Sequence, residues 1–159
     1  MISESTLQRL ETQLEVVPRL LSGASTEAVL LHSTSGKWSA HENLAHLARH
    51  HAIFLERLHR IVTENAPKLD RYRAEDDPAW AEWASLSIEE VLRRLATLRE
   101  EIVHRIKALP EEETNRVGIH PLFGEMSLAL WIEFFLLHEA HHLYVVMTRL
   151  GEARINLSK

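Results

Sequence analysis

The sequence contains no cysteine among its 159 residues, which excludes disulfide bonds, thiolate ligands and cysteine nucleophiles. Any metal ion must therefore be bound by histidine and carboxylate side chains. The lack of cysteine also fits a reducing compartment. No apolar run approaches the roughly 18 residues of a membrane-spanning helix, and the amphipathic, acidic N-terminal stretch lacks the apolar core of a secretory signal. We therefore predict a cytoplasmic protein that does not insert into membranes.

The sequence also has no excess of positive charge. It contains 18 lysines and arginines against 23 aspartates and glutamates, which gives a formal net charge of −5 at pH 7. Nucleic-acid binding depends on lysines and arginines that neutralise phosphates. The charge balance therefore argues against a nucleic-acid partner.

Glycine is scarce, and all five glycines fall between or after segments with periodic apolar residues. Glycine in such places separates helices. Apolar residues recur every three or four positions in four long segments, the pattern of amphipathic helices. The predicted helices span residues 5–21, 40–64, 88–109 and 128–150. With no convincing strand elsewhere, they predict an all-α fold, a four-helix bundle that forms a single domain over residues 1–159.

Particular residues mark the ends of these helices. Ser39 followed by Glu42 has the spacing of a capping box, which begins the second helix. Pro18 is expected to disturb the first helix near its end, because proline cannot donate a backbone hydrogen bond. Gly151 is expected to end the last helix as a C-cap.

The connections between the helices are long. Residues 65–86 are predicted to form a long irregular connection, and Trp80 and Trp83 are expected to anchor it to the body of the protein. Residues 117–127 read as a turn or short hairpin before the last helix. The long connections that follow the first and second helices favour a crossover topology over a simple up-and-down bundle.

Histidine is abundant, with 11 residues, although it is not among the common residues of globular domains. Seven of these residues form two clusters: His41, His46, His50 and His51 in the first, and His138, His141 and His142 in the second. On a helix, His138 and His142 are one turn apart and leave the same face. Two imidazoles so placed can share a metal ion, but a third ligand must come from elsewhere. The alternative is that they are core histidines satisfied by hydrogen bonds.

The stretch from His138 to His142 also satisfies the pattern H-E-x-x-H, the zinc-binding motif of many metalloproteases. In such an enzyme Glu139 would be the general base, and a third ligand would usually follow the motif. The 17 residues after His142 contain no histidine. A metalloprotease is therefore only a remote alternative.

The first cluster offers several candidates for the third ligand. Helical periodicity places His51 on the apolar stripe of residues 40–64, whereas His46 lies about 130° from the centre of that stripe. His50 follows His46 by one turn. Periodicity alone therefore favours His51 as the third ligand, and His46 and His50 remain alternatives.

Three motifs together resemble the DinB-like family. They are W-S-x-x-E-x-x-x-H-L from Trp38 to Leu47, P-x-F-G-x-M-S from Pro121 to Ser127, and H-E-x-H-H from His138 to His142. The resemblance covers most of the chain, in the family's order. It implies a four-helix bundle with a divalent metal ion at one end and, in many members, a homodimer. By the family's pattern the ion is bound by His46, His138 and His142.

The resemblance also implies a class of reaction. Family members include transferases and isomerases that use low-molecular-weight thiols, and metal-dependent hydrolases, so we expect a small-molecule substrate. Zinc or nickel is the expected ion, with a low-molecular-weight thiol as the expected cosubstrate of a transferase. The sequence departs from the family at Arg49, where many members carry an acidic residue. It departs again at Leu143 to Val145, where many carry Gly-Gln, and both positions are near enough to the site to change the substrate.

Two hypotheses about the metal remain. The first is a metal-dependent enzyme, a thiol S-transferase or hydrolase, in which Glu139 is a candidate catalytic base and Glu42 and His141 are candidates to orient a ligand. The second is a metal-binding, stress-associated bundle without turnover, in which the metal is structural. Loss of stability on chelation would favour the second hypothesis.

Overall fold

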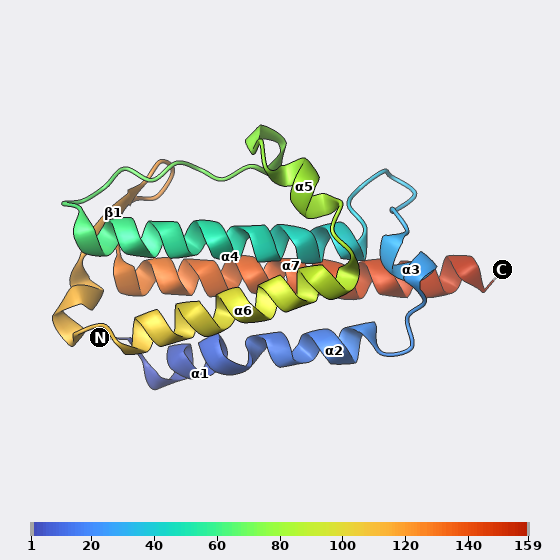
Figure 1. Cartoon of the computed structure of the whole chain (residues 1–159), viewed down its shortest axis with the longest axis horizontal. Helices are drawn as coiled ribbons and strands as arrows, with labels where there is room; N and C mark the ends of the chain where they lie inside the picture. Colours follow the sequence, from blue (N-terminus) through green and yellow to red (C-terminus); the bar gives the residue numbers. More distant parts are fainter. Residues whose placement is uncertain (1, 159) are drawn as a thin grey trace.

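A computed structural model describes residues 2–158 and shows a predominantly helical protein with one short hairpin (Figure 1). The predicted all-α four-helix bundle is confirmed. The helices are α1 (Glu4–Thr12), α2 (Val16–Leu21), α3 (Thr26–Leu30), α4 (Ala40–Thr63), α5 (Trp80–Ala84), α6 (Ile88–Lys107) and α7 (Leu128–Leu157). Short 3₁₀ turns lie at η1 (Gln13–Glu15), η2 (Ala74–Asp76) and η3 (Glu111–Asn115), and the hairpin consists of β1 (Val117–His120) and β2 (Gly124–Ser127).

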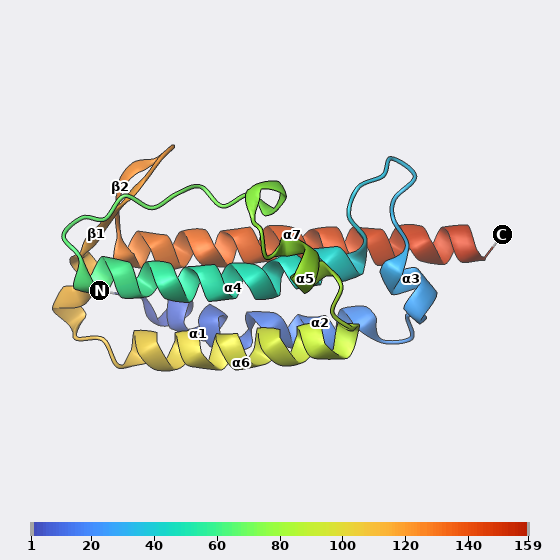
Figure 2. The same ribbon diagram turned by 45° about the horizontal axis from the view of Figure 1, so that its top comes forward.

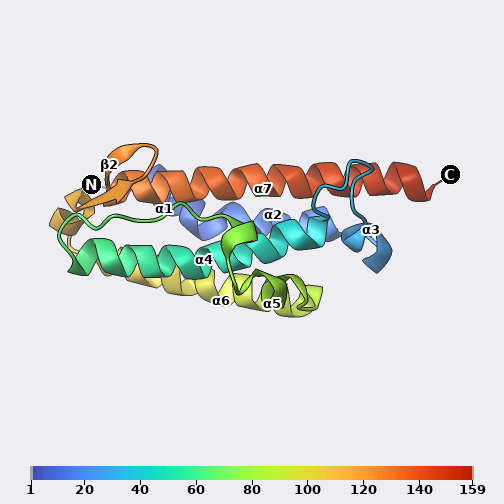
Figure 3. The same cartoon turned by 90° about the horizontal axis from the view of Figure 1, so that it is seen from above.

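The long helices lie side by side, and their chains run in two opposite directions. α4 and α6 run the same way, whereas α7 and the α1–α2 segment run the opposite way (Figures 1 and 2). Two parallel helices cannot be joined by a tight turn, so the connection from α4 to α6 returns along the whole length of α4 (Figure 3). This is the predicted crossover. None of the described helices is both long enough and apolar enough to cross a membrane.

Local sequence explains how α4 begins and why the first helix is broken. The amide of Glu42 donates to Ser39 Oγ at 3.1 Å, and the amide of Ser39 donates to the Glu42 carboxylate at 2.8 Å, which completes the predicted capping box. Pro18 has no amide hydrogen to donate to the carbonyl of Leu14, four residues earlier. The helical path accordingly tightens to the 3₁₀ turn η1, which contains Leu14, before α2 begins.

The predicted end of the last helix at Gly151 is wrong. α7 continues through Gly151 to Leu157, over 30 residues. The reason is tertiary packing, because Leu150 and Ala153, on either side of the glycine, are buried. Packing of the last turns of α7, including contacts with α3, outweighs the modest helix-breaking tendency of one glycine.

A buried polar network joins four helical segments through Glu139 of α7. Its fully buried carboxylate accepts hydrogen bonds from Arg99 of α6 and, at 2.8 Å, from Gln13 Nε2. His51 Nε2 of α4 lies 3.1 Å from the same carboxylate, and Arg99 also donates to the carbonyl of Leu10. Removing one partner from such a network leaves a buried charge uncompensated, which is strongly destabilising.

Gly151→Ala should raise the free energy of unfolding by roughly 0.5–1 kcal/mol, because glycine is a poor helix former and alanine a good one. A Cβ at position 151 meets no atom within 4 Å. Urea denaturation followed by circular dichroism measures the change. A loss of stability would contradict the continuous helix, because alanine is disfavoured in the left-handed conformation of a C-cap.

Gly118→Ala is the matched comparison. A Cβ at position 118 would lie 2.9 Å from both Ile61 Cγ1 and Trp131 Nε1 in the packed core. We expect this variant to lose about 1–3 kcal/mol by overpacking.

Candidate metal site

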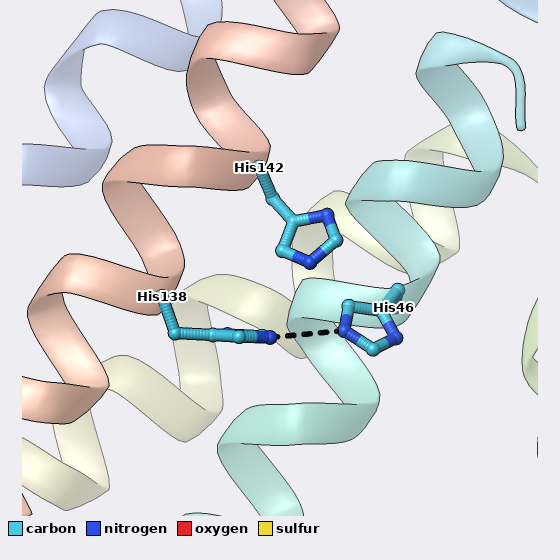
Figure 4. A group of neighbouring side chains, drawn as sticks. All are labelled: His46, His138 and His142. Carbon is cyan, nitrogen blue, oxygen red and sulfur yellow. Dashed lines mark hydrogen bonds between the residues drawn. The ribbon is translucent and has the colours of Figure 1, made fainter. Parts of the chain in front are cut away.

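Three histidines from two helices converge between α4 and α7. His46 projects from α4, and His138 and His142 project from successive turns of α7 (Figure 4). One nitrogen atom of each imidazole lies within 4.8 Å of the other two. The Nε2 atoms of His46 and His138 are 3.2 Å apart. The structure thus brings together the three histidines to which the family resemblance pointed.

This donor set fits a divalent metal ion. Zinc binds histidine nitrogens at about 2.0–2.1 Å, so two nitrogens on one ion lie roughly 3–3.4 Å apart. The distance of 3.2 Å between the Nε2 atoms of His46 and His138 falls in this range. Among residues 2–158, no other group of three or more histidine or carboxylate donors comes together in this way.

Burial keeps the three imidazoles uncharged, which is the form that binds a metal. Removal from water lowers the pKa of His46 to about 4, against a small opposing influence of Glu75. Burial, together with the neighbouring histidines, lowers the pKa of His138 to about 2 and that of His142 to about 3. All three side chains are therefore neutral at physiological pH.

Asn43, which none of the sequence motifs singles out as a site residue, orients His142. The Nδ2 group of Asn43 donates to the carbonyl of Ser39 at 2.8 Å, so its Oδ1 atom faces His142. His142 Nδ1 lies 2.8 Å from this oxygen and must carry the proton that it donates. The lone pair of His142 then resides on Nε2, as a metal ligand requires. The available signal was a polar residue three positions before His46, where it shares one face of the helix with that histidine.

The other histidines of the first cluster have different surroundings. His51 Nδ1 donates to the carbonyl of Leu47, and its Nε2 faces Glu139, so His51 belongs to the buried network. His50 is buried with its ring 3.9 Å from that of His138, but it lies outside the three-donor group. Periodicity correctly indicates that His51 is buried, but the face carrying His51 is turned away from the site.

Glu139 does not line the cavity at the histidines, although it is adjacent to His138 in sequence. Its fully buried carboxylate points into the bundle, where it accepts hydrogen bonds from Arg99 and Gln13. This position gives no support to a role as catalytic base. Glu42 and His141 are the two candidates for orienting a ligand. The Glu42 carboxylate accepts the amide of Ser39 in the capping box, whereas the exposed ring of His141 packs edge-on against His142.

A cavity of about 710 Å³ opens beside the three histidines. Trp38 and Tyr72 line it near His46, with ring centroids 5.1 and 5.3 Å from that imidazole. Phe123 of the hairpin and Phe134 of α7 also contribute to its wall, as do arginines of α4 and the crossover. A cavity of this size admits a small molecule.

The crossover between α4 and α6 forms part of the cavity wall and is held in place by specific contacts. Arg49 stands where many family members carry an acidic residue. It makes an ion pair with Asp77 at 2.6 Å and so anchors the crossover. Trp80 stacks on Trp38 with centroids 5.0 Å apart, and Arg94 lies over the ring of Trp83. The predicted anchoring by the two tryptophans is confirmed.

His120 is buried in the wall of the cavity. Its Nδ1 atom accepts hydrogen bonds from the amides of Leu122 and Phe123 at 3.1 Å and so fixes the turn of the hairpin. Its ring also stacks on Phe123.

Comparison with known proteins points to one family. The model of the DinB superfamily matches residues 9–146. "Uncharacterized protein YuaE" of Bacillus subtilis is 31% identical over 147 residues, which cover 85% of this chain and 88% of that protein. "Putative metal-dependent hydrolase OB0413" of Oceanobacillus iheyensis is 24% identical over 139 residues, or 86% of this chain and 79% of that protein.

A similar fold is present in a solved structure. YfiT from Bacillus subtilis, described as "a probable metal-dependent hydrolase with an unusual four-helix bundle topology", superposes with a TM-score of 0.79. The alignment covers 99% of this chain and 91% of YfiT at 19% sequence identity. At this identity the likeness shows the shared fold alone.

Asn43→Leu should allow His142 to adopt both neutral tautomers. Leucine has a similar volume to asparagine but offers no acceptor for the Nδ1–H group of His142. In ¹⁵N NMR of the metal-free protein, we expect a single Nδ1–H tautomer in the wild type and a mixture in Asn43→Leu. Asn43→Asp, which retains an acceptor oxygen, should keep the single tautomer. A mixture in the wild type would show that Asn43 does not orient this ring.

The stability of the metal-free protein should fall as the pH drops from about 6.5 towards 4. The folded-state pKa values of these histidines lie below the unfolded value, so the unfolded chain binds more protons in this window. Each histidine contributes at most about 1.4 kcal/mol per pH unit. Denaturant titrations across this range should show a shallower slope for His142→Gln than for the wild type. Substitution of the exposed His59 by glutamine serves as the control, and a pH-independent free energy of unfolding would contradict the account.

Proposed function

The chain belongs to the DinB superfamily, whose model matches most of its length, and on this premise we propose that it is a metal-dependent enzyme acting on a small molecule. His46, His138 and His142 would hold one divalent ion. The observation that carries the proposal is the meeting of three neutral imidazoles, one buried and two half-buried, from two helices beside an open cavity. The name of the Oceanobacillus relative, which includes "metal-dependent hydrolase", agrees with this proposal.

Zinc or nickel suits this site, because imidazole is a favoured ligand of both ions and no thiolate is present. Three protein ligands leave a position for water or substrate, as in catalytic rather than structural sites. When bound, such an ion lowers the pKa of a water molecule or a thiol, which supports either hydrolysis or thiol transfer. Because the chain has no cysteine, a transferred thiol must enter as a low-molecular-weight cosubstrate.

The protein's own residues have separate tasks in this proposal. Asn43 holds His142 in the tautomer that presents Nε2. The aromatic side chains of Trp38, Tyr72 and Trp80 pack around His46 and limit the access of water. Glu139 holds helices together instead of moving protons, which removes the base that a metalloprotease would require.

We also propose that the protein is a homodimer. α7 carries a row of exposed apolar side chains at intervals of seven and three residues. They are Leu130, Leu137, Tyr144 and Met147, each at least 50% exposed. A second copy of the same helix face would remove this surface from water.

Substitution of any of the three histidines should abolish tight metal binding. We expect His46→Ala, His138→Ala and His142→Ala each to weaken the affinity for zinc at least 100-fold, because two imidazoles make a weak site. Competition with a chromophoric chelator measures the affinity, and elemental analysis of the purified protein gives the stoichiometry.

His51→Ala is the matched control for these variants. It should lose stability, through Glu139, but keep its affinity for zinc. The proposal fails if His46→Ala binds zinc as tightly as the wild type while His51→Ala does not. Removal of zinc by a chelator should leave the helical circular dichroism spectrum intact, whereas unfolding would indicate a structural metal.

A further inference from the structure

One end of the cavity is positively charged, and the proposed metal site does not use this feature. Arg57 of α4 lines the cavity together with Arg71 and Arg73 of the crossover. Arg73 is paired with Asp76 at 3.5 Å and Glu75 also lines the cavity, so the positive charge comes mainly from Arg57 and Arg71. Arg57 lies 11 residues after His46, so the two side chains leave α4 within about 20° of each other. They are separated by about 16 Å along the helix axis. The cavity therefore extends along one face of α4 from the histidines to a cluster of arginines.

Arg57 is buried without an acidic partner. Only 7% of the residue is exposed, yet it forms no ion pair with any carboxylate of residues 2–158. Its Nη2 atom donates to the carbonyl of Asp70 at 2.6 Å, and its guanidinium group lies 5.5 Å from the ring centre of Trp131. Burial lowers the pKa of Arg57, although Glu56 and Asp70 oppose this effect. A buried charge without a counter-charge is costly to the folded protein.

The surroundings of Arg57 add to the positive potential and supply an apolar surface. Burial and the nearby charges of Arg57 and Arg71 lower the pKa of His120, which favours the neutral form of this imidazole. Leu122, Phe123 and Phe134 line the same part of the cavity, and the first two are more than half exposed.

We propose that this end of the cavity binds the anionic group of the substrate or cosubstrate, with Arg57 as the principal contact. The ligand is an elongated small molecule with a carboxylate or phosphate at Arg57 and an apolar portion against the phenylalanines. Its reacting part lies at the three histidines, and only this last statement rests on the proposed function. A guanidinium group suits the task because it offers paired donors that match carboxylate and phosphate oxygens.

The test compares two ligands of nearly equal shape. In ¹⁹F NMR titrations, 4-fluorobenzoate should bind at least tenfold more tightly than the neutral 4-fluorobenzamide. Arg57→Gln should remove this preference, and Arg57→Lys should retain part of it. Arg60→Gln is the matched control, because it removes a charge from the next turn of α4 that is already paired with Glu64 and does not line this cavity. 4-Fluorophenyl phosphate in place of 4-fluorobenzoate shows whether phosphate or carboxylate is preferred.

The wild-type protein provides a readout that does not depend on the folding of any variant. Trp131 lies beneath Arg57, whereas Trp83 is outside the cavity wall. Addition of 4-fluorobenzoate should shift the indole N–H resonance of Trp131 and leave that of Trp83 unchanged.

Titrations with and without zinc separate this inference from the proposed function. We expect a preference for the anion that depends on Arg57 in both forms. A preference that appears only with zinc and is insensitive to Arg57 would overturn the inference, because the carboxylate would then be bound to the metal. Failure to bind zinc, with the Arg57-dependent preference intact, would instead overturn the proposed function alone.

Discussion

The placement of three uncharged imidazoles, largely removed from water between α4 and α7, is the constraint on which the rest of the site depends. A neutral imidazole that is removed from water is most stable when its ring nitrogens have hydrogen-bond or metal partners. The packing of α4 on α7 brings His46 to 3.2 Å from His138 and sets Asn43 against His142. The same packing leaves the cavity open on one side, where the crossover and hairpin complete its wall.

The residues of the H-E-x-x-H motif thus lie on two different faces of α7. His138 and His142 face α4 and the cavity, whereas Glu139 points into the bundle and meets Arg99. A metalloprotease uses all three residues at one zinc ion, but here the glutamate is held by Arg99 of α6 and by Gln13. Arg99 and Arg57 also differ: the first is neutralised by Glu139, and the second lines the cavity without an acidic partner.

Much of this arrangement can be predicted from the sequence, but the parts that depend on tertiary packing cannot. Apolar periodicity locates the long helices, and Ser39 with Glu42 marks the start of α4, because these features depend on neighbours in the chain. Periodicity also finds the buried face that carries His51, but it cannot show that His46, and not His51, meets His138 and His142. That assignment came from family resemblance. The end of α7 at Gly151 was wrong for a related reason, since burial of the following turn is invisible to local propensity.

The central claim is that one divalent ion is bound by His46, His138 and His142. A crystal grown with zinc and measured above and below the zinc absorption edge tests this claim most directly. We predict one anomalous peak per chain in contact with these three imidazoles, with His142 Nδ1 still bonded to Asn43. A peak at His50, His51 or Glu139, or no peak between α4 and α7 in zinc-saturated crystals, would contradict the account.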